Sequence, residues 1–126
     1  MSAPTLIDTS VWIEALRDDG DVAVRAMVEQ FLSDDTALFC DPVRLELWNG
    51  ARDDKQRKHL KEMETVLPRL EISGRVWNLA CEYAVKARGK GFTVPANDLL
   101  IFACAKHYGV ELEHKDRHYD LLATLP

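Results

Sequence analysis

The sequence predicts an α/β protein, a three-layer α/β/α sandwich around a central, mainly parallel sheet. Apolar runs of strand length alternate along the chain with longer segments in which apolar residues recur every three or four positions. Helix-capping residues directly follow two of these runs, as expected where helices connect parallel strands. Because the 126 residues contain no linker, repeat or low-complexity stretch, we expect one domain over residues 1–126.

The first half of the chain opens with a short apolar strand that ends at Asp8, and the next residues fit a helix that opens at Thr9 or Ser10. Further on, Asp41 and Pro42 come directly after a second apolar run. Asp is a favoured N-cap and Pro fits the first helical position, so we expect Asp41 to cap a helix that starts at Pro42. The expected elements are a strand over residues 5–7, helices over 10–17 and 22–32, a strand over 37–40 and a helix from 42 to 49 or 50.

In the second half, the apolar run over residues 99–105 is too long for a typical strand and stops before Gly109, so we predict a buried helix. Residues 110–114 alternate between apolar and polar, which is typical of a strand with one face on the core. The remaining expected elements are a polar amphipathic helix over 53–66, a brief strand at 70–72, a helix over 76–87 and a short helix within 116–125.

The composition is that of an ordinary globular protein, with 47% hydrophobic and 29% charged residues. No apolar run reaches the roughly 18 residues that a membrane span needs, and the N-terminus lacks the pattern of a signal peptide. We therefore expect a cytoplasmic protein with no membrane partner. The net charge of −5 does not indicate a nucleic-acid binder, but acids that hold divalent ions add negative charges that the ions cancel.

The three cysteines, Cys40, Cys81 and Cys104, are widely spaced and lie among apolar residues. An odd number without a CxxC pair argues against a disulfide framework or a zinc site, so we expect buried thiols. The three tryptophans are expected to anchor the core or an interface rather than to stack on bases.

Four acids stand where predicted strands end or the following helices begin. Asp8 closes the first strand, and Glu46 lies between two leucines on the helix after the second. Asp98 directly precedes the apolar run over 99–105, and Asp116 follows the last strand within two residues. In a parallel sheet, the carboxyl ends of the strands share one edge, where α/β proteins bind ligands. We therefore expect the four carboxylates to converge at this edge.

Each acid also has an ordinary structural explanation. Asp8 and Asp98 suit helix capping, Asp116 suits a turn, and Glu46 suits a solvated helix face. Four independent structural roles of this kind are a poor explanation for four acids at one edge. We therefore interpret Asp8 as a metal ligand and leave helix capping to one of the two hydroxyl residues that follow it. Which hydroxyl caps and which faces the site stays open.

Clustered carboxylates repel one another, and hard divalent cations remove that repulsion. Mg²⁺ or Mn²⁺ prefers oxygen ligands and leaves positions for water and substrate phosphate. Such a cluster suits phosphodiester hydrolysis, because the ion lowers the pKa of water and neutralises charge in the transition state. The four histidines lack zinc-site spacing, although His118 stands close enough to Asp116 to touch the edge of the site.

Four motifs follow one another along the chain: Leu6-Ile7-Asp8-Thr9-Ser10, Glu46-Leu47-Trp48-Asn49-Gly50-Ala51-Arg52, Asn97-Asp98-Leu99-Leu100-Ile101-Phe102-Ala103-Cys104-Ala105 and Asp116-Arg117-His118-Tyr119. Together they resemble the PIN-domain ribonucleases, and most of all the VapC toxins of bacterial and archaeal toxin–antitoxin pairs. Any one motif is weak, but the ordered set spans nearly the whole chain.

The resemblance implies a PIN-like sandwich and a Mg²⁺- or Mn²⁺-dependent endoribonuclease. It implies that Asp8, Glu46, Asp98 and Asp116 are the catalytic, metal-binding acids, with Thr9 or Ser10 as the hydroxyl partner of the first. It also implies a homodimer, a cognate VapB-type antitoxin that lies across the active-site groove, and structured RNA (tRNA, rRNA or mRNA) as the substrate.

One position departs from the family pattern. Many relatives carry a second acid or Asn two residues after the last acid, and this chain has His118 there. Asp120 would lie half a turn away on a helix and is a poor substitute. The departure affects a second metal ion rather than the first, so a one-metal mechanism is expected, with any other ion entering with RNA.

Phosphate contacts to RNA come from basic side chains. Basic residues are densest directly after the Glu46 helix and again before the Asp98 segment. A solvated helix face explains any one of them equally well. The residues expected to contact RNA are Arg52, Lys55, Arg57, Lys90 and His118.

Two other functions fit the same residues. A housekeeping PIN nuclease would process RNA without an antitoxin, and an inert PIN fold would act as a binding module. Retention of all four acids speaks against the inert module, because a scaffold gains nothing from their mutual repulsion.

Overall fold

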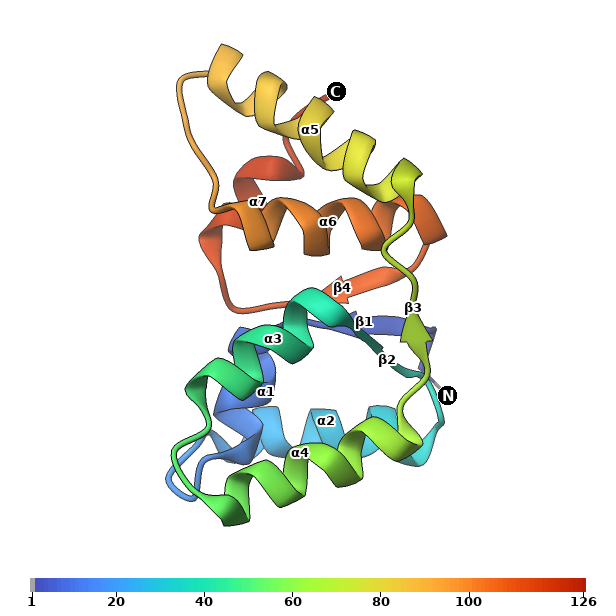
Figure 1. The fold of residues 1–126 in the computed structure, drawn as a ribbon, viewed down its shortest axis with the longest axis vertical. Coiled ribbons are helices and arrows are strands. Elements are labelled where there is room, and N and C mark those ends of the chain that lie inside the picture. The colour runs from blue at the N-terminus through green and yellow to red at the C-terminus, as the bar shows by residue number, and fades with distance from the viewer. Residues whose placement is uncertain (1) are drawn as a thin grey trace.

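The computed structural model describes residues 2–126 and contains one four-stranded parallel sheet (Figure 1). The strands are β1 (Thr5–Ile7), β2 (Ala37–Cys40), β3 (Arg69–Leu70) and β4 (Glu111–Glu113), in the spatial order β3-β2-β1-β4. The first strand is central: Leu6 aligns with Leu38 of β2 on one side and with Leu112 of β4 on the other. The last strand of the chain therefore completes the sheet beside the first.

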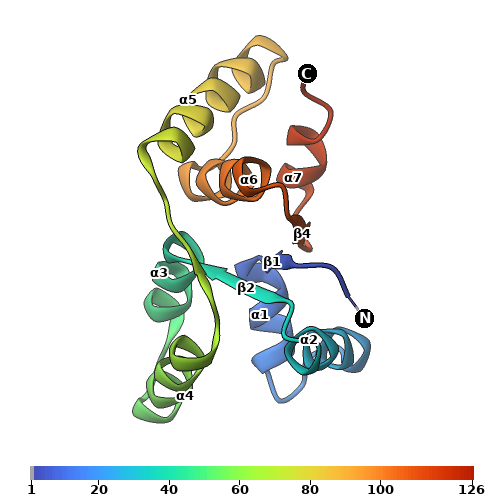
Figure 2. The same ribbon diagram turned by 90° about the vertical axis from the view of Figure 1, so that its right-hand side faces the viewer.

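Helices cover both faces of this sheet, which confirms the three-layer α/β prediction. Figures 1 and 2 show α5, α6 and α7 on one side, with α1, α2 and α4 on the other. The helices are α1 (Thr9–Leu16), α2 (Val22–Ser33), α3 (Asp41–Gly50), α4 (Asp54–Val66), α5 (Gly74–Gly89), α6 (Ala96–Tyr108) and α7 (Arg117–Leu122). Among the described residues, no helix is both long and apolar enough to cross a bilayer.

The core lies on both sides of the sheet. Leu6 and Ile7 of β1 are fully buried, and so is Ile101 in the middle of α6. Helix α6 is buried along most of its length, from Leu100 to Ala105, as its unbroken apolar sequence predicts. Asp8 directly follows the central strand, and Asp98 lies in the first turn of this buried helix. Both acids are therefore attached to elements that the core holds in place.

The cap predicted for the third helix is wrong. Helix α3 begins at Asp41, and the N-cap position belongs to Cys40, whose side chain makes no capping bond. Cys40 still has the extended backbone of β2, so Asp41 already lies in the first helical turn. There its carboxylate faces the positive end of the helix dipole and pairs with Arg69 of β3 at 3.2 Å.

Two of the three cysteines are buried as predicted, and the third is not. Cys40 and Cys104 are fully buried, whereas Cys81 is exposed on α5. The apolar neighbours of Cys81 in sequence turn to other faces of the helix, and Cys81 shares an outward face with Trp77, which is 54% exposed. Trp12 is buried, as expected of a core anchor.

Candidate functional site

The four predicted acids occupy the carboxyl edge of the sheet or the helices that leave it. Asp8 follows β1 directly, and Glu46 lies in the middle of α3, which follows β2. Asp98 is in the first turn of α6, and Asp116 is the N-cap of α7, just beyond β4. The parallel strand order brings these segments together from positions more than 100 residues apart.

Asp8 is both a helix cap and a buried site residue, with 3% of its surface exposed. Its Oδ2 accepts hydrogen bonds from the backbone N–H of Ser10 at 3.0 Å and from the Ser10 hydroxyl at 2.5 Å. The expectation that Thr9 or Ser10 would cap α1 is therefore wrong. The strand leaves Asp8 in extended backbone, the conformation of an N-cap, so its own carboxylate reaches the free N–H groups of the helix.

The two hydroxyl residues serve different acids. The Thr9 hydroxyl donates to Oε1 of Glu46 at 2.8 Å, which ties the half-buried carboxylate of α3 to the start of α1. The Ser10 hydroxyl donates to Asp8 and accepts from the backbone N–H of Lys115 at 3.0 Å. Thr9 thus orients Glu46, while Ser10 connects Asp8 to the segment that leads to Asp116.

Tyr119 is a site residue that the sequence patterns did not identify. It lies on α7 with 1% of its surface exposed, and its hydroxyl is 2.6 Å from Oδ1 of Asp8 and 3.4 Å from Oδ1 of Asp98. Burial, then the Asp8 and Asp98 carboxylates, raise the pKa of Tyr119 far above its ordinary value, so the phenol stays a neutral donor. Its place one helical turn after Asp116 could have suggested this role, because a buried Tyr needs a hydrogen-bond partner.

Asp98, Asp116 and His118 form the tightest group of possible metal ligands among the described residues. One donor atom from each lies within 4.8 Å of the other two. Nδ1 of His118 is 2.8 Å from Oδ1 of Asp116 and 3.4 Å from Oδ2 of Asp98. The side chain of Asn97 donates to the backbone carbonyl of Pro42 at 3.0 Å, which fixes the first turn of α6 against the start of α3.

The two carboxylates of this group have opposite pKa shifts. Desolvation, followed by the charges of Asp116 and Asp8, raises the pKa of Asp98 to about 6. Partial burial also acts to raise the pKa of Asp116, but the backbone N–H and ring of His118 outweigh it and leave that pKa below its usual value. Asp116 is therefore stabilised as a carboxylate, while Asp98 resists ionisation until a cation is added.

The donor set fits a divalent cation. Asp98 and Asp116 contribute carboxylate oxygens, and Asp8 keeps a lone pair on Oδ1 beyond the one that accepts from Tyr119. Glu46 adds to the negative charge around Asp98, because its carboxylate also raises the pKa of that acid. The excess of negative charge is what a bound cation would neutralise.

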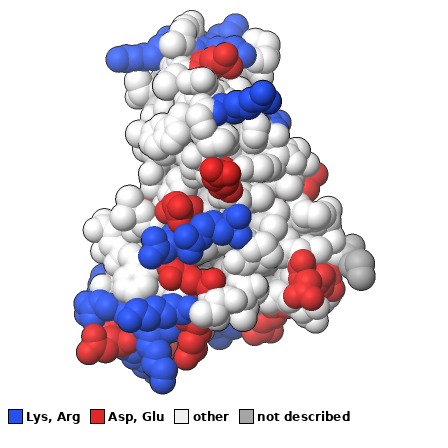
Figure 3. Space-filling view, turned by 45° about the vertical axis from the view of Figure 1, so that its right-hand side comes forward, with Lys and Arg blue, Asp and Glu red and all other residues white. Residues whose placement is uncertain are grey.

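The residues predicted to contact RNA are spread over several elements. Arg52 lies between α3 and α4, Lys55 and Arg57 lie on the first turns of α4, and Lys90 follows α5. Arg57 is paired with Asp54 at 2.9 Å, whereas Lys55 and Lys90 are exposed. His118 stands apart from this group, since its ring faces the acids. Figure 3 shows basic side chains gathered at the lower end of the molecule, where α4 lies, with acids among them.

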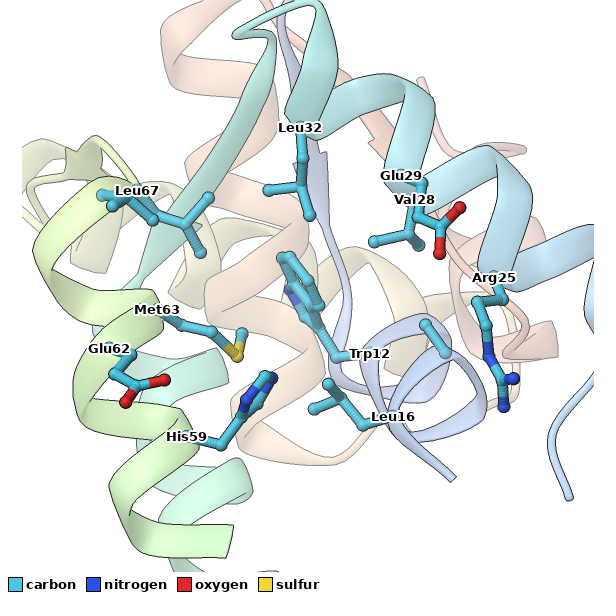
Figure 4. A pocket seen from close by; sticks show the side chains of 12 residues that line it. Trp12, Leu16, Arg25, Val28, Glu29, Leu32, His59, Glu62, Met63 and Leu67 are labelled. Atoms are coloured by element: carbon cyan, nitrogen blue, oxygen red, sulfur yellow. The ribbon is translucent and has the colours of Figure 1, made fainter. Parts of the chain in front are cut away.

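An apolar groove of about 400 Å³ lies between α1, α2 and α4, on the face of the sheet opposite α6 (Figure 4). Trp12 and Leu16 of α1, Val28 and Leu32 of α2, and Met63 of α4 line it. The buried indole N–H of Trp12 has no hydrogen-bond partner among the described residues. Arg25, Glu29, His59 and Glu62 add polar groups to the lining.

Comparison with known proteins gives one consistent family. A family profile described as "PIN domain" matches residues 5–125. The chain is 34% identical over 124 residues to VapC ribonuclease Mb1587 of Mycobacterium bovis, an alignment that covers 95% of this chain and 92% of that protein.

Solved structures share the fold at lower identity. VapBC2 from Rickettsia felis, solved with a DNA fragment from its promoter, superposes with a TM-score of 0.77 at 17% identity over 97% of this chain and 92% of that chain. VapC20 of Mycobacterium tuberculosis, described as a sarcin–ricin loop cleaving toxin, superposes with a TM-score of 0.71 at 18% identity over 97% and 96%.

Proposed function

The chain belongs to the PIN-domain family, among its VapC ribonucleases, and on that basis we propose that it is a metal-dependent endoribonuclease toxin that hydrolyses structured RNA and is neutralised by an antitoxin. The observation that carries the proposal is the acid cluster at the carboxyl edge of the sheet. Asp98 and Asp116 share one site with His118, and Asp8 is joined to Asp98 through the Tyr119 hydroxyl. A cytoplasmic location fits RNA as the substrate.

Asp98 and Asp116 would hold the cation, Mg²⁺ or Mn²⁺, with Asp8 and Glu46 beside them. When bound, the ion would act as a Lewis acid that activates water and stabilises negative charge on the phosphate. The protein supplies the positioning. Tyr119 and Ser10 fix both oxygens of Asp8, while the Thr9 hydroxyl fixes Glu46. These side chains hold the acids at their places before substrate arrives, which is how a rigid site avoids reorganisation during the reaction.

The direct test is cleavage of structured cellular RNA by the purified protein with Mg²⁺ or Mn²⁺. Asp98→Asn and Asp8→Asn are expected to lose cleavage by at least about a hundredfold, because each removes a carboxylate that the ion needs. Asp120→Asn is the matched control: Asp120 lies on the same helix as His118, but its side chain is 77% exposed and pairs with His114. Folded wild-type protein that cuts no cellular RNA and arrests no growth on expression would overturn the proposal.

Sequencing RNA 5′ ends after induced expression tests activity and target together. The toxin predicts new ends at few sites in tRNA, rRNA or mRNA, together with growth arrest that co-expression of the antitoxin reverses. A housekeeping PIN nuclease predicts processed ends without growth arrest. An inert module predicts no new ends and no cation binding that depends on Asp8 or Asp98.

We propose that the antitoxin docks in the groove between α1, α2 and α4. An amphipathic helix places residues at i, i+3 and i+4 on one face, and a groove with an apolar floor and polar groups among its lining suits such a segment. Basic side chains on the same segment would complement the acids at the edge of the sheet. In this arrangement one segment of the antitoxin would bind in the groove, and its basic side chains would lie near the acids of the site.

Leu16→Lys and Met63→Lys test the docking site, because each places a charge in the apolar lining. Both variants are expected to lose antitoxin binding in calorimetry while RNA cleavage persists. Leu121→Lys, at a 38% exposed leucine on α7, should leave antitoxin binding unchanged. Unaltered affinity in both groove variants would place the antitoxin elsewhere.

We also propose a homodimer, which the exposed face of α5 supports. Trp77 and Val85, 54% and 72% exposed, stand on one face of the helix with Cys81 between them. An apolar stripe of this kind is more typical of an interface than of a free surface. Light scattering should give a dimer for the wild type and a monomer for Trp77→Ser, and a monomeric wild type would contradict the proposal.

A further inference from the structure

The imidazole ring of His118 points its Nδ1 atom toward Asp98 and Asp116. Its side chain is 29% exposed, and Nδ1 is within hydrogen-bonding distance of Asp116 and 3.4 Å from Asp98. The backbone N–H of His118 also donates to Oδ1 of Asp116 at 2.9 Å, which fixes the residue at the start of α7. The resemblance to PIN-domain ribonucleases led us to expect an acid or Asn at this position, where the sequence has His118.

Two of the separations between donor atoms are close to those expected for neighbouring ligands of one ion. With metal–ligand distances of about 2.1 Å, neighbouring ligands are about 3.0 Å apart and opposite ligands about 4.2 Å apart. The two separations from Nδ1, 2.8 Å to Asp116 and 3.4 Å to Asp98, lie on either side of the neighbouring value. All three donors lie within 4.8 Å of one another, so small side-chain adjustments would place them around one ion.

We propose that His118 is a nitrogen ligand of the divalent ion, together with Asp98 and Asp116, and that it makes the site prefer Mn²⁺ to Mg²⁺. The inference rests on the proposed function in that the site must bind an ion. Mg²⁺ is a hard cation that favours oxygen ligands and gives up water reluctantly. Imidazole favours first-row transition ions, so replacing an oxygen ligand by His118 shifts selectivity toward them.

Two other roles for His118 predict different results. As an imidazolium it would act as a fixed cation between the carboxylates, in competition with the metal, and its removal would then strengthen the binding of Mg²⁺ and Mn²⁺ alike. As an RNA contact it would leave metal affinity unchanged. The metal-ligand role alone predicts a loss of affinity that is larger for Mn²⁺ than for Mg²⁺.

The test combines calorimetry with pulsed electron paramagnetic resonance on Mn²⁺, without RNA. In wild-type protein the spin-echo signal of Mn²⁺ should show coupling to a directly bound ¹⁴N. His118→Ala should lose this coupling and bind Mn²⁺ about tenfold or more weakly, with less than a threefold change for Mg²⁺. His118→Asp, which restores an oxygen ligand, should bind both ions without nitrogen coupling and with the preference for Mn²⁺ reduced.

The control is His107→Ala, at an exposed histidine in the last turn of α6, which should retain the coupling and both affinities. Circular dichroism checks that every variant is folded. Mn²⁺ that binds in an Asp98-dependent manner without nitrogen coupling would overturn the role of His118 and leave the proposed nuclease standing. Wild-type protein that binds neither ion would overturn both.

Discussion

Tyr119 shows how one hydroxyl can organise a charged site. The phenol donates to Oδ1 of Asp8 from 2.6 Å and lies 3.4 Å from Oδ1 of Asp98, whereas the Ser10 donors reach only the other oxygen of Asp8. A buried acceptor that loses its donor keeps the whole cost of its desolvation. The residue therefore contributes to the stability of the site in the absence of metal.

Tyr119→Phe is expected to lower the free energy of unfolding by about 1–3 kcal/mol, because Asp8 loses a buried donor while the ring is retained. Urea unfolding of the metal-free protein measures this. Tyr83→Phe is the matched control, since the Tyr83 ring also packs against Phe102 but the residue is half-buried on α5. Equal midpoints for Tyr119→Phe and the wild type would contradict the role given to the hydroxyl.

The raised pKa of Asp98 gives the metal-free protein a characteristic pH dependence. In the folded state Asp98 keeps its proton up to about pH 6, whereas an unfolded Asp loses it at about pH 4. Between these values the folded state binds more protons than the unfolded state. The contribution of Asp98 to the free energy of unfolding is therefore fully present below about pH 4 and is lost as the pH rises through about 6.

Melting temperatures measured with a chelator from pH 4 to 8 test this. The difference between Asp98→Asn and the wild type should grow in favour of the variant as the pH rises, because Asn has no proton to lose. Asp120→Asn should follow the wild type. A difference that stays constant across the range would show that Asp98 titrates normally.

At the scale of the elements, most strands and helices follow from apolar periodicity, and the errors lie at their ends. The sequence pattern predicts a third strand at residues 70–72, whereas β3 spans Arg69–Leu70, because pairing with Phe39 and Cys40 of β2 sets its limits. The pattern also favours Asp41 as a helix cap, a position that Cys40 occupies instead. Such boundaries depend on which backbone groups meet across the sheet, and the sequence pattern does not contain that information.

The junction between α6 and β4 depends on Gly109, which has φ of 65° at the C-terminal end of the helix. Gly109→Ala should destabilise the protein by about 1 kcal/mol, because an L-residue is strained in this left-handed conformation although the space around it is open. Thermal unfolding measures the loss. Gly89→Ala, at a helical glycine with open space around it, should be neutral or stabilising. A loss of the same size in both variants would show that the left-handed conformation of Gly109 is not its cause.

At the scale of the whole molecule, the convergence of the four acids could be predicted from the topology of a parallel sheet. The hydrogen bonds that hold these acids in place could not. The pattern of strands and helices placed Asp8, Asp98 and Asp116 at one edge. The bond from Tyr119 to Asp8 spans 111 positions in sequence, so only the folded chain reveals it. The pairing of Thr9 with Glu46 and of Ser10 with Asp8 likewise depends on the angle at which α1 leaves the sheet.

A divalent ion should stabilise the whole fold, because it relieves the repulsion among these acids. At an Mn²⁺ concentration about a hundredfold above its dissociation constant, binding contributes about 2.7 kcal/mol, which corresponds to roughly 10 °C in melting temperature for a chain of this size. A chelator should reverse the increase. Asp116→Asn should reduce it strongly, whereas Asp19→Asn, at an acid remote from the site with 87% of its side chain exposed, should retain it.

The contact between Asp8 and Tyr119 also bears on how the protein is made. Asp8 is synthesised early, but β4, one of the two strands that pair with β1, and the Tyr119 hydroxyl that holds the Asp8 carboxylate are synthesised much later, the hydroxyl 111 positions after Asp8. A partly synthesised chain therefore cannot form the site. A fragment that ends before residue 116 is expected to lack both Asp116 and Tyr119, and with them the complete acid cluster.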